Sequence, residues 1–360
     1  MRLTMGASDF SLTDFTYNDL PTGESDFELA SFSMAQDTVD VIPVMQEILQ
    51  YEPRVRIMAT PWSAPAWMKT NVRLAGGKLR PDCYEVYARY FVRYIEAMRE
   101  NGIQVDAITP QNEPLHFTAS YPCMEMQALE QAEFIKKHLG PAFKTHKIST
   151  RIIAYDHNWD RPDYPLSILD DPEAKPFVAG AAFHAYAGSP DAMSLLHKAH
   201  PEKGLYFTEI SGGDWAPDFS DNLMWYLRNV FIGSIQQNAR MVLFWNLMLD
   251  TQHGPKNGGC QDCRGVVTLL EDGSIRRNEE YYALSHFSKF VKPGALRIDY
   301  SLSGAASDLG VSAFENPDGQ IIAVLANFEQ KARKISIVLG KDVWRFEMPG
   351  RSVATWTNPI

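Results

Sequence analysis

Short apolar stretches, each bounded by polar or turn-forming residues, recur along most of the chain. Stretches of this length that lack a strict polar alternation are typical of strands buried on both faces of a parallel sheet. The pattern predicts seven such strands, at Arg2–Gly6, Val55–Thr60, Val105–Pro110, Arg151–Tyr155, Val178–His184, Gly204–Glu209 and Arg240–Asn246.

Apolar residues between these stretches are spaced by three or four positions, which predicts amphipathic helices. One helix carries Val41 to Leu49, with Asp37 as its expected N-cap, and a second carries Tyr84 to Met98 and stops at Asn101-Gly102. A third is expected to start at Ser189-Pro190. The remaining expected helices are Leu223–Ile235 and Tyr281–Val291.

Regular alternation of strands and helices predicts an α/β fold with a parallel sheet, either doubly wound or closed into a (β/α)8 barrel of the TIM type. Polar and aromatic residues at the carboxyl ends of several strands, with no glycine-rich loop after the first, favour the barrel. These residues are Asp9, Trp62, Glu113, His184, Glu209 and Trp245.

The pattern changes after about residue 292, where short strand-like runs flank turns such as Asn316-Pro317-Asp318-Gly319. We therefore expect a barrel domain over residues 1–291 and a small antiparallel β side domain over 292–360 that packs on it. The runs lie at Val311–Phe314, Ile321–Ala326, Lys334–Leu339, Trp344–Met348 and Val353–Trp356.

Composition narrows the choice of partners. The 360 residues are 45% hydrophobic, and the formal net charge is 34 − 44 = −10 with scattered positive residues, so no nucleic-acid partner is expected. No apolar run reaches the length of a membrane-spanning helix, and Met1–Gly6 lack the apolar core of a secretory signal. We expect the chain as given to be soluble, with a neutral or small substrate.

Cys260 and Cys263 form a C-x-x-C pair with no second pair elsewhere. A structural zinc site has four protein ligands, and the C-x-x-C pair supplies only two. Free thiols are therefore favoured over a zinc site, and a local disulfide is the next alternative.

Glu113 and Glu209 each follow an apolar strand, which suggests two carboxyl groups at one face of the sheet. Pro114 is expected to keep Glu113 in an extended backbone conformation. Two carboxyl groups held about 5 Å apart suit a retaining glycosidase, in which one is a nucleophile and the other a general acid and base. This carboxylate chemistry needs no metal or organic cofactor, and we expect none.

Six segments, in order along the chain, resemble glycoside hydrolase family 30, the glucosylceramidase-like retaining β-glycosidases. They are Thr60–Asn71, Gln111–Leu115, Tyr155–Trp159, Phe183–Tyr186, Phe207–Ser211 and Trp245–Leu247. The resemblance implies a (β/α)8 barrel with a β-rich side domain, Glu113 as acid and base, and Glu209 as nucleophile. It also implies substrate-binding roles for Asp9, Trp62, Asn112, His184, Tyr186 and Trp245, and support of the nucleophile by Arg2.

Relatives in the family carry an N-terminal stretch ahead of the segment that matches Arg2–Phe10, and that stretch supplies the first barrel strand. We therefore expect the barrel to lack or replace this strand. Open sheet edges would invite pairing with another copy, so homo-oligomerisation or lowered stability is expected.

The sequence thus predicts an enzyme, a retaining β-glycoside hydrolase for β-glucosides or related β-linked sugars. The alternative is a non-catalytic or impaired carbohydrate-binding protein, because the strand is missing. The sugar and aglycone stay open, as does endo against exo action, although exo action is preferred. Localisation also stays open, since the family is often secreted whereas this chain shows no signal peptide.

Overall fold

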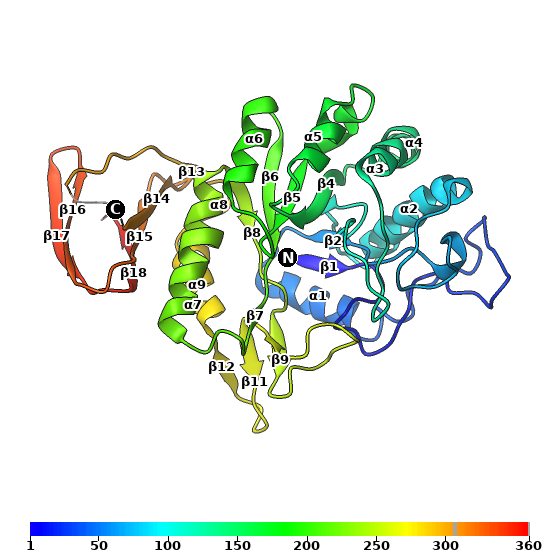
Figure 1. Ribbon diagram of the computed structural model, residues 1–360, viewed down its shortest axis with the longest axis horizontal. Helices are drawn as coiled ribbons and strands as arrows, with labels where there is room; N and C mark the ends of the chain where they lie inside the picture. The colour runs from blue at the N-terminus through cyan, green and yellow to red at the C-terminus, as the bar shows by residue number, and fades with distance from the viewer. Residues whose placement is uncertain (305–307, 359–360) are drawn as a thin grey trace. The chain divides into compact units, whose positions relative to one another are not determined.

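The computed structural model describes residues 1–304 and 308–358, and the course of the chain is drawn in Figure 1. The chain divides into two compact units. The first consists of Met1–Ile210 with Gly254–Gln261, and the second of Ser211–His253 with Asp262–Ile360.

The first unit is built on a parallel sheet in which each strand pairs with the next one along the chain. Its strands are β1 (Arg2–Thr4), β2 (Met58–Thr60), β3 (Ala107–Ile108), β4 (Arg151–Asn158), β5 (Val178–His184) and β6 (Gly204–Glu209). Six of the seven expected strands are therefore confirmed here. Because parallel strands end at the same edge, the loops after them meet there.

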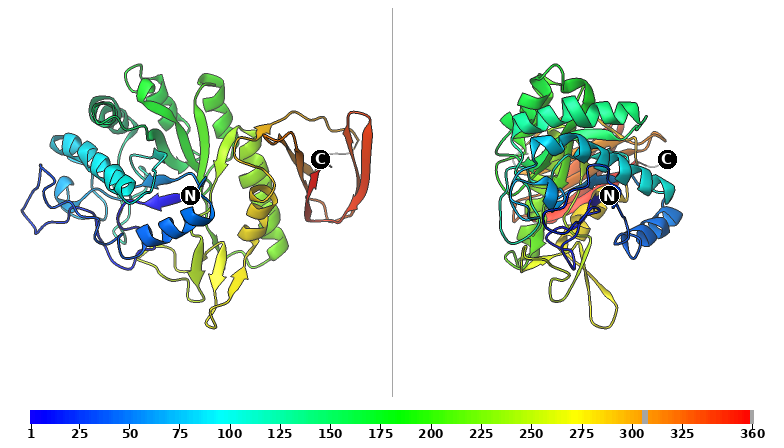
Figure 2. Two further views of the ribbon diagram at one scale, coloured as in Figure 1. Left: turned by 180° about the vertical axis from the view of Figure 1, so that it is seen from behind. Right: turned by 90° about the vertical axis from the view of Figure 1, so that its right-hand side faces the viewer.

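Helices follow the strands and lie on the outer side of the curled sheet in Figures 1 and 2. They are α1 (Val41–Tyr51), α2 (Tyr84–Glu100), α3 (Ala128–Phe134), α4 (Gly140–Thr145), α5 (Asp163–Asp170) and α6 (Asp191–Ala199), with a π-helical segment (Ile135–Leu139) joining α3 to α4. Short 3₁₀ turns lie at Ala66–Met68, Pro81–Cys83 and Lys175–Phe177. This arrangement is the expected α/β class.

The expected N-cap of α1 is wrong. The carboxylate of Asp40 accepts the Val41 N–H at 2.6 Å and caps the helix, whereas Asp37 is buried and accepts the Tyr17 hydroxyl at 2.7 Å. The carboxylate of Asp37 is engaged by Tyr17, and Asp40, which directly precedes the helix, is the N-cap.

The second unit contains β8 (Ala239–Val242), the seventh expected strand. Helix α7 (Phe219–Trp225) continues through a π-helical segment (Tyr226–Phe231) into α8 (Ile232–Gln236), and α9 is Glu279–Ser288. The short strands are β7 (Gly212–Gly213), which pairs with β10 (Cys263–Arg264), and β9 (Met248–Asp250), which with β12 (Ile275–Arg277) flanks β11 (Val267–Leu269).

All five expected C-terminal strands are confirmed in the second unit. Strands β13 (Leu296–Arg297), β14 (Leu309–Glu315), β15 (Ile321–Asn327) and β18 (Ser352–Thr357) form an antiparallel sheet, and β16 (Arg333–Leu339) pairs with β17 (Asp342–Met348). Val311, Leu325 and Met348 are buried between them. The ring of Phe314 meets that of Phe287 on α9 at 6.3 Å. The boundary between residues 291 and 292 stays a prediction.

The cysteines divide into two kinds. Cys83 and Cys123 are buried free thiols, whereas Cys260 and Cys263 are disulfide-bonded. The sequence-based preference for two free thiols at the C-x-x-C pair was therefore wrong. Separately, within the described part of the chain no helix is both long and apolar enough to cross a membrane.

Candidate active site

Glu113 and Glu209 lie close together at the carboxyl edge of the sheet in the first unit. Glu209 is the last residue of β6, and Glu113 lies in the loop that follows β3. One ligand atom each from Glu113, Glu209 and His184 lie within 4.8 Å of one another. The side chain of Glu209 is 5% exposed and that of Glu113 is 15% exposed, so solvent reaches Glu113 more easily.

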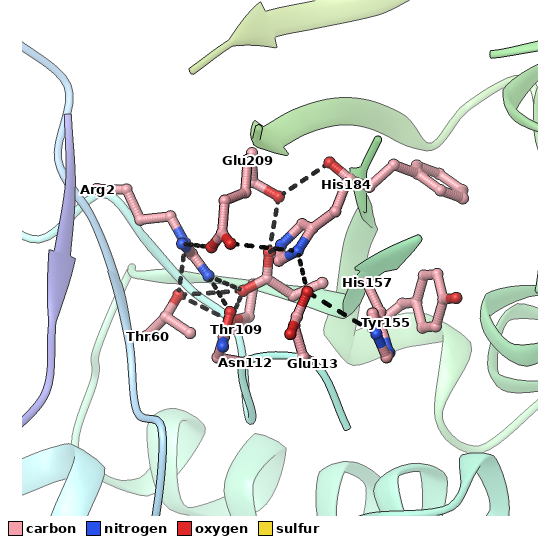
Figure 3. A network of polar contacts seen from close by, with 12 residues as sticks. Arg2, Thr60, Thr109, Asn112, Glu113, Tyr155, His157, His184 and Glu209 are labelled. Atoms are coloured by element: carbon pink, nitrogen blue, oxygen red, sulfur yellow. Dashed lines mark hydrogen bonds and ion pairs between the residues drawn. The ribbon is translucent and has the colours of Figure 1, made fainter. Parts of the chain in front are cut away.

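Arg2, on β1, holds Glu209 from one side (Figure 3). One terminal nitrogen of its guanidinium lies 2.6 Å from Glu209 Oε2, and the other donates to Asn112 Oδ1 at 2.6 Å and to Asp156 Oδ2 at 2.9 Å. The Arg2 side chain is 4% exposed. A guanidinium buried among these acceptors fixes the carboxylate and favours its ionised form.

Asp156, on β4, is a carboxylate that accepts hydrogen bonds from several buried side chains of the site. It is fully buried, and both of its oxygens accept hydrogen bonds. The donors are Arg2 (2.9 Å), Thr109 (2.7 Å) and Thr60 (3.3 Å) on Oδ2, and Thr208 (2.7 Å) and His184 (3.1 Å) on Oδ1. Asp156 therefore joins the Arg2 side of the site to the His184 side.

His184, the last residue of β5, lies between two carboxyl groups. Its Nδ1 is 3.0 Å from Glu113 Oε1 and its Nε2 is 3.1 Å from Asp156 Oδ1. Nδ1 is also 3.8 Å from Glu209 Oε1, and the side chain has no exposed surface. Figure 3 shows the imidazole between Glu113 and Glu209.

The backbone at this edge is strained. Glu113 has φ +42°, and Tyr155 and Asp156 have φ +75°, all in the left-handed region that non-glycine residues rarely adopt. The Glu113 N–H donates to the Asp156 carbonyl at 2.9 Å, which holds the two residues together. The expected extended conformation of Glu113 before Pro114 is therefore wrong, because this contact outweighs the local preference.

The charges in the cluster shift the pKa values of its members. Burial acts to raise the pKa of Glu113, but the hydrogen bond and charge of His184 lower it to about 2. Burial acts to lower the pKa of His184, but Glu209, Asp156 and Glu113 raise it to about 9. Burial raises the pKa of Glu209, against the opposing effects of His184 and Arg2. Asp156 has a lowered pKa despite its burial because Arg2 and His184 stabilise its charge.

Several residues expected to bind the sugar surround these groups. The Tyr186 hydroxyl donates to Glu209 Oε1 at 3.1 Å, and Tyr186 is 45% exposed. Asn112 is buried and held by Arg2, whose guanidinium lies 4.9 Å from the centre of the buried Trp62 ring. Contact of these groups with a sugar stays a prediction.

Asp9 and Trp245 are placed differently. The Asp9 carbonyl accepts the Asn257 N–H at 2.7 Å, so the segment 254–261 lies against Asp9 within the first unit. Trp245 belongs to the second unit, where its backbone forms a parallel bridge with Ser211. The sugar-binding role assigned to Trp245 stays a prediction.

Four further residues were not assigned roles from the sequence. Asp156 and His157 lie next to each other on β4, and His157 Nε2 is 3.8 Å from Glu113 Oε1. Tyr121 and His116 form a hydrogen bond of 2.8 Å in the loop after Glu113. Burial raises the pKa of Tyr121, and the charges of Asp9 and Glu113 add to this effect. The polar residues that end the apolar stretch of β4 were the available clue to Asp156.

Glu113, His184 and Glu209 also have the spacing of a metal site. A cation there would share Glu209 with the Arg2 guanidinium and would face an imidazole whose raised pKa favours its own positive charge. The arrangement of charges therefore suits carboxylate chemistry better than metal binding.

A parallel α/β sheet with two adjacent buried carboxyl groups at its carboxyl edge is typical of enzymes that hydrolyse glycosidic bonds. A family model described as the glycosyl hydrolase family 30 TIM-barrel domain matches residues 1–291, and one described as the family 30 beta sandwich domain matches residues 294–356. The chain belongs to glycosyl hydrolase family 30 and is an O-glycosyl hydrolase.

Curated relatives include the endo-1,6-beta-D-glucanase neg1 of Aspergillus fumigatus, 34% identical over 389 residues that cover 100% of this chain and 76% of the relative. The lysosomal acid glucosylceramidase of Mus musculus is 30% identical over 350 residues, covering 91% of this chain and 67% of the relative. The solved structure of the endo-beta1,6-glucanase BT3312 has a TM-score of 0.92 at 37% identity, over 99% of this chain and 82% of that one.

Proposed function

We propose that this chain hydrolyses β-linked glucosides by double displacement with retention of configuration. The observation that carries the proposal is the proximity of Glu113 and Glu209, whose nearest carboxylate oxygens lie within 4.8 Å. Retaining glycosidases hold their two carboxyl groups about 5 Å apart, whereas inverting enzymes need roughly 6.5 to 9.5 Å to admit a water molecule. The spacing supports direct attack by one carboxylate.

Glu209 is the proposed nucleophile. Its Oε2 is held by Arg2 and its Oε1 by the Tyr186 hydroxyl, so both oxygens are oriented and the guanidinium favours the ionised form. In the first step Glu209 attacks the anomeric carbon and forms an ester as the glycosidic C–O bond breaks. In the second step water attacks that carbon and Glu209 leaves as a carboxylate.

Glu113 is the proposed acid and base. It is the more exposed of the two carboxyl groups, as a residue that meets the leaving group should be. It gives a proton to the departing oxygen in the first step and takes one from the attacking water in the second.

We further propose β-1,6-glucan as the substrate, with Asn112, Trp62, Asp9, Tyr186 and Trp245 as sugar-binding residues. The support comes from relatives named endo-1,6-beta-D-glucanase, which align with the full length of this chain at 32 to 34% identity. Incubation with β-1,6-glucan, β-1,3-glucan and aryl β-glucosides tests the choice. Chromatography of early products separates endo cleavage, which gives mixed oligomers, from exo cleavage, which gives glucose.

Substitutions at the two carboxyl groups test the mechanism. Glu209→Gln should lower turnover of an aryl β-glucoside by at least ~10⁴-fold. Glu113→Gln should spare kcat/KM for dinitrophenyl glucoside, whose leaving group needs no protonation, but should lower kcat because the second step loses its base. Glu133→Gln removes a partly exposed carboxylate of α3 that pairs with Lys137 in the following π-helical segment, and serves as the matched control. NMR of the first-formed anomer tests retention.

Unchanged turnover in Glu209→Gln would refute the assignment of the nucleophile. Binding of glucosides by the wild type without release of any aglycone would instead favour a carbohydrate-binding protein. An α-anomer as the first product from a β-glucoside would contradict retention.

Pairing between copies is a separate proposal. Within the described residues β1 is an outer strand of its sheet, and backbone groups on such an edge can pair with another strand. A second copy of this chain is the proposed partner. Light scattering across a range of concentrations tests it, and a monodisperse monomer of high thermal stability would contradict it.

A further inference from the structure

The position of His184 limits which of Glu113, His184 and Asp156 can carry protons. A neutral imidazole carries one N–H, yet both nitrogens of His184 face carboxylate oxygens at 3.0 and 3.1 Å. With both carboxyl groups ionised, a neutral ring would turn one lone pair toward another lone pair. The geometry therefore requires two protons along the line from Glu113 through His184 to Asp156.

With Asp156 ionised beside the Arg2 guanidinium, two arrangements satisfy this requirement. In the first, His184 is an imidazolium and donates to both carboxylates. In the second, His184 is neutral with its proton on Nε2, and Glu113 is a carboxylic acid that donates to Nδ1. The two arrangements differ by the transfer of one proton over the 3.0 Å between Nδ1 and Glu113 Oε1.

We propose that His184, held by Asp156, stores the proton that Glu113 delivers to the leaving group. This inference rests on the proposed function, because it gives Glu113 its acid role. In the empty site the proton is on His184, and sugar binding moves it to Glu113 by removing the water that stabilises the separated charges. His184 and Asp156 act through Glu113 and are positioning residues.

The transfer leaves the number of protons in the site unchanged. The Nδ1–H bond breaks as an O–H bond forms on Glu113, and the imidazole keeps its Nε2 proton on Asp156. Glu113 then protonates the glycosidic oxygen as the C–O bond breaks, and becomes a carboxylate. In the second step Glu113 takes a proton from the attacking water and returns it to Nδ1 when product leaves.

Asp156 is well suited to anchor His184. Its Oδ2 is held by Arg2 and threonine hydroxyls, while Oδ1 accepts from Thr208 and faces His184 Nε2. An ionised carboxylate fixed in this way keeps Nε2 protonated in both arrangements. The proton that can leave His184 is therefore the one on Nδ1, which faces Glu113.

The other groups around His184 agree with this assignment. Glu113, Glu209 and Asp156 are carboxyl groups that favour the imidazolium, and they raise the pKa of His184 to about 9. His157 also faces Glu113, but burial lowers its pKa to about 4, so it is neutral near pH 7 and does not compete as the store. The Tyr186 ring, at 6.1 Å, and Arg2, which reaches His184 through Asp156, complete the surroundings.

Kinetics on His184→Gln test the proposal. With a poor leaving group, kcat/KM should fall by about 10²-fold or more, and with dinitrophenyl glucoside by only a few-fold, because that substrate needs no acid. The alkaline limb of the pH profile should move from near pH 9 to pH 7 or below, where Glu113 must hold the proton alone. His200→Gln, which removes a buried histidine bonded to Asp170 at 2.9 Å, should leave both activities unchanged.

Equal losses on both substrates with an unmoved alkaline limb would show that His184 only supports the structure, and would overturn the proposal. An inactive wild type would overturn the proposed function instead, so the two failures can be told apart.

A second measurement needs no variant. Nitrogen-15 NMR of histidine-labelled wild type should show His184 as an imidazolium in the free protein. A β-linked thiodisaccharide, which resists hydrolysis, should convert it to a neutral ring protonated at Nε2. A neutral ring in the free protein, or an imidazolium in both states, would overturn the proton store whatever the kinetics show.

Discussion

The Arg2 guanidinium lies 2.6 Å from Glu209 Oε2, although the two residues are separated by 207 positions along the chain. Strand β1 brings Arg2 to the carboxyl edge of the sheet, where β6 ends in Glu209. The same guanidinium also reaches Asn112 and Asp156, so one side chain orients the proposed nucleophile, the amide proposed to bind sugar, and the carboxylate that contacts His184.

Arg2→Lys should lower kcat/KM for an aryl β-glucoside by about 10²-fold, because a lysine cannot serve several acceptors in one plane. Lysine keeps the positive charge but not the close contact of the guanidinium with Glu209 Oε2, which weakens an effect that lowers the pKa of Glu209. Glu209 would then ionise only at higher pH, so the acid limb of the pH profile should move upward. A full pH profile of both proteins measures this, and an unmoved acid limb would contradict it.

Tyr186→Phe removes the hydroxyl that donates to Glu209 Oε1 at 3.1 Å. A hydrogen bond to a charged group contributes roughly 1.5 to 3 kcal/mol, so kcat should fall by about 10-fold or more. Tyr51→Phe is the matched control, since Tyr51 is 83% exposed at the end of α1. A change in KM alone would place Tyr186 in sugar binding and not in orienting the nucleophile.

The sequence was sufficient to predict the two carboxyl groups because their positions depend on a simple rule. Apolar strands of a parallel sheet end at one edge, so Glu113 after β3 and Glu209 at the end of β6 could be expected to approach each other there. The five C-terminal strands were predictable for a similar reason, since their alternating residues face a small core.

Asp156 could not be assigned a role in the same way. In a regular strand Asp156 and His157 would point to opposite faces, but the pairing of β4 with β5 shifts between Tyr155 and His157. The left-handed backbone at Tyr155 and Asp156 accompanies this irregularity and brings both polar side chains to the site. The predicted backbone conformation of Glu113 was also wrong, because the Glu113 N–H donates to the carbonyl of Asp156, which lies 43 positions further along the chain.

The pKa of His184 predicts a dependence of stability on pH. Its raised value of about 9, against 6.5 in the unfolded chain, corresponds to about 3 kcal/mol of unfolding free energy. Because the folded pKa is the higher one, this stabilisation is complete below about pH 6.5 and is lost as pH rises through 9. Urea unfolding from pH 6 to 10 measures it.

The pH dependence of the unfolding free energy has to be compared between wild type and His184→Gln, because Lys69 changes stability with pH in the opposite direction. Burial lowers the pKa of the Lys69 amine to about 7, so its contribution to stability increases as pH rises from there. The difference in unfolding free energy between wild type and His184→Gln isolates His184, and should shrink by about 3 kcal/mol between pH 6 and 10. A constant difference would contradict the raised pKa.

Gly259→Ala tests whether Asp9 binds the sugar. A Cβ at Gly259 would lie 2.6 Å from Asp9 Cβ and 2.8 Å from its Oδ2, so the added methyl group must displace Asp9 or the segment that carries it. Gly259 does not need a left-handed backbone, so the expected cost is steric. KM for an aryl β-glucoside should rise several-fold with little change in thermal stability, as expected if Asp9 contacts the sugar and not the leaving group.

Gly273→Ala, whose added methyl group meets nothing within 4 Å, is the control for backbone strain. Equal kinetic constants for Gly259→Ala and wild type, with a crystal structure of the variant that shows Asp9 displaced, would place Asp9 outside the sugar-binding site.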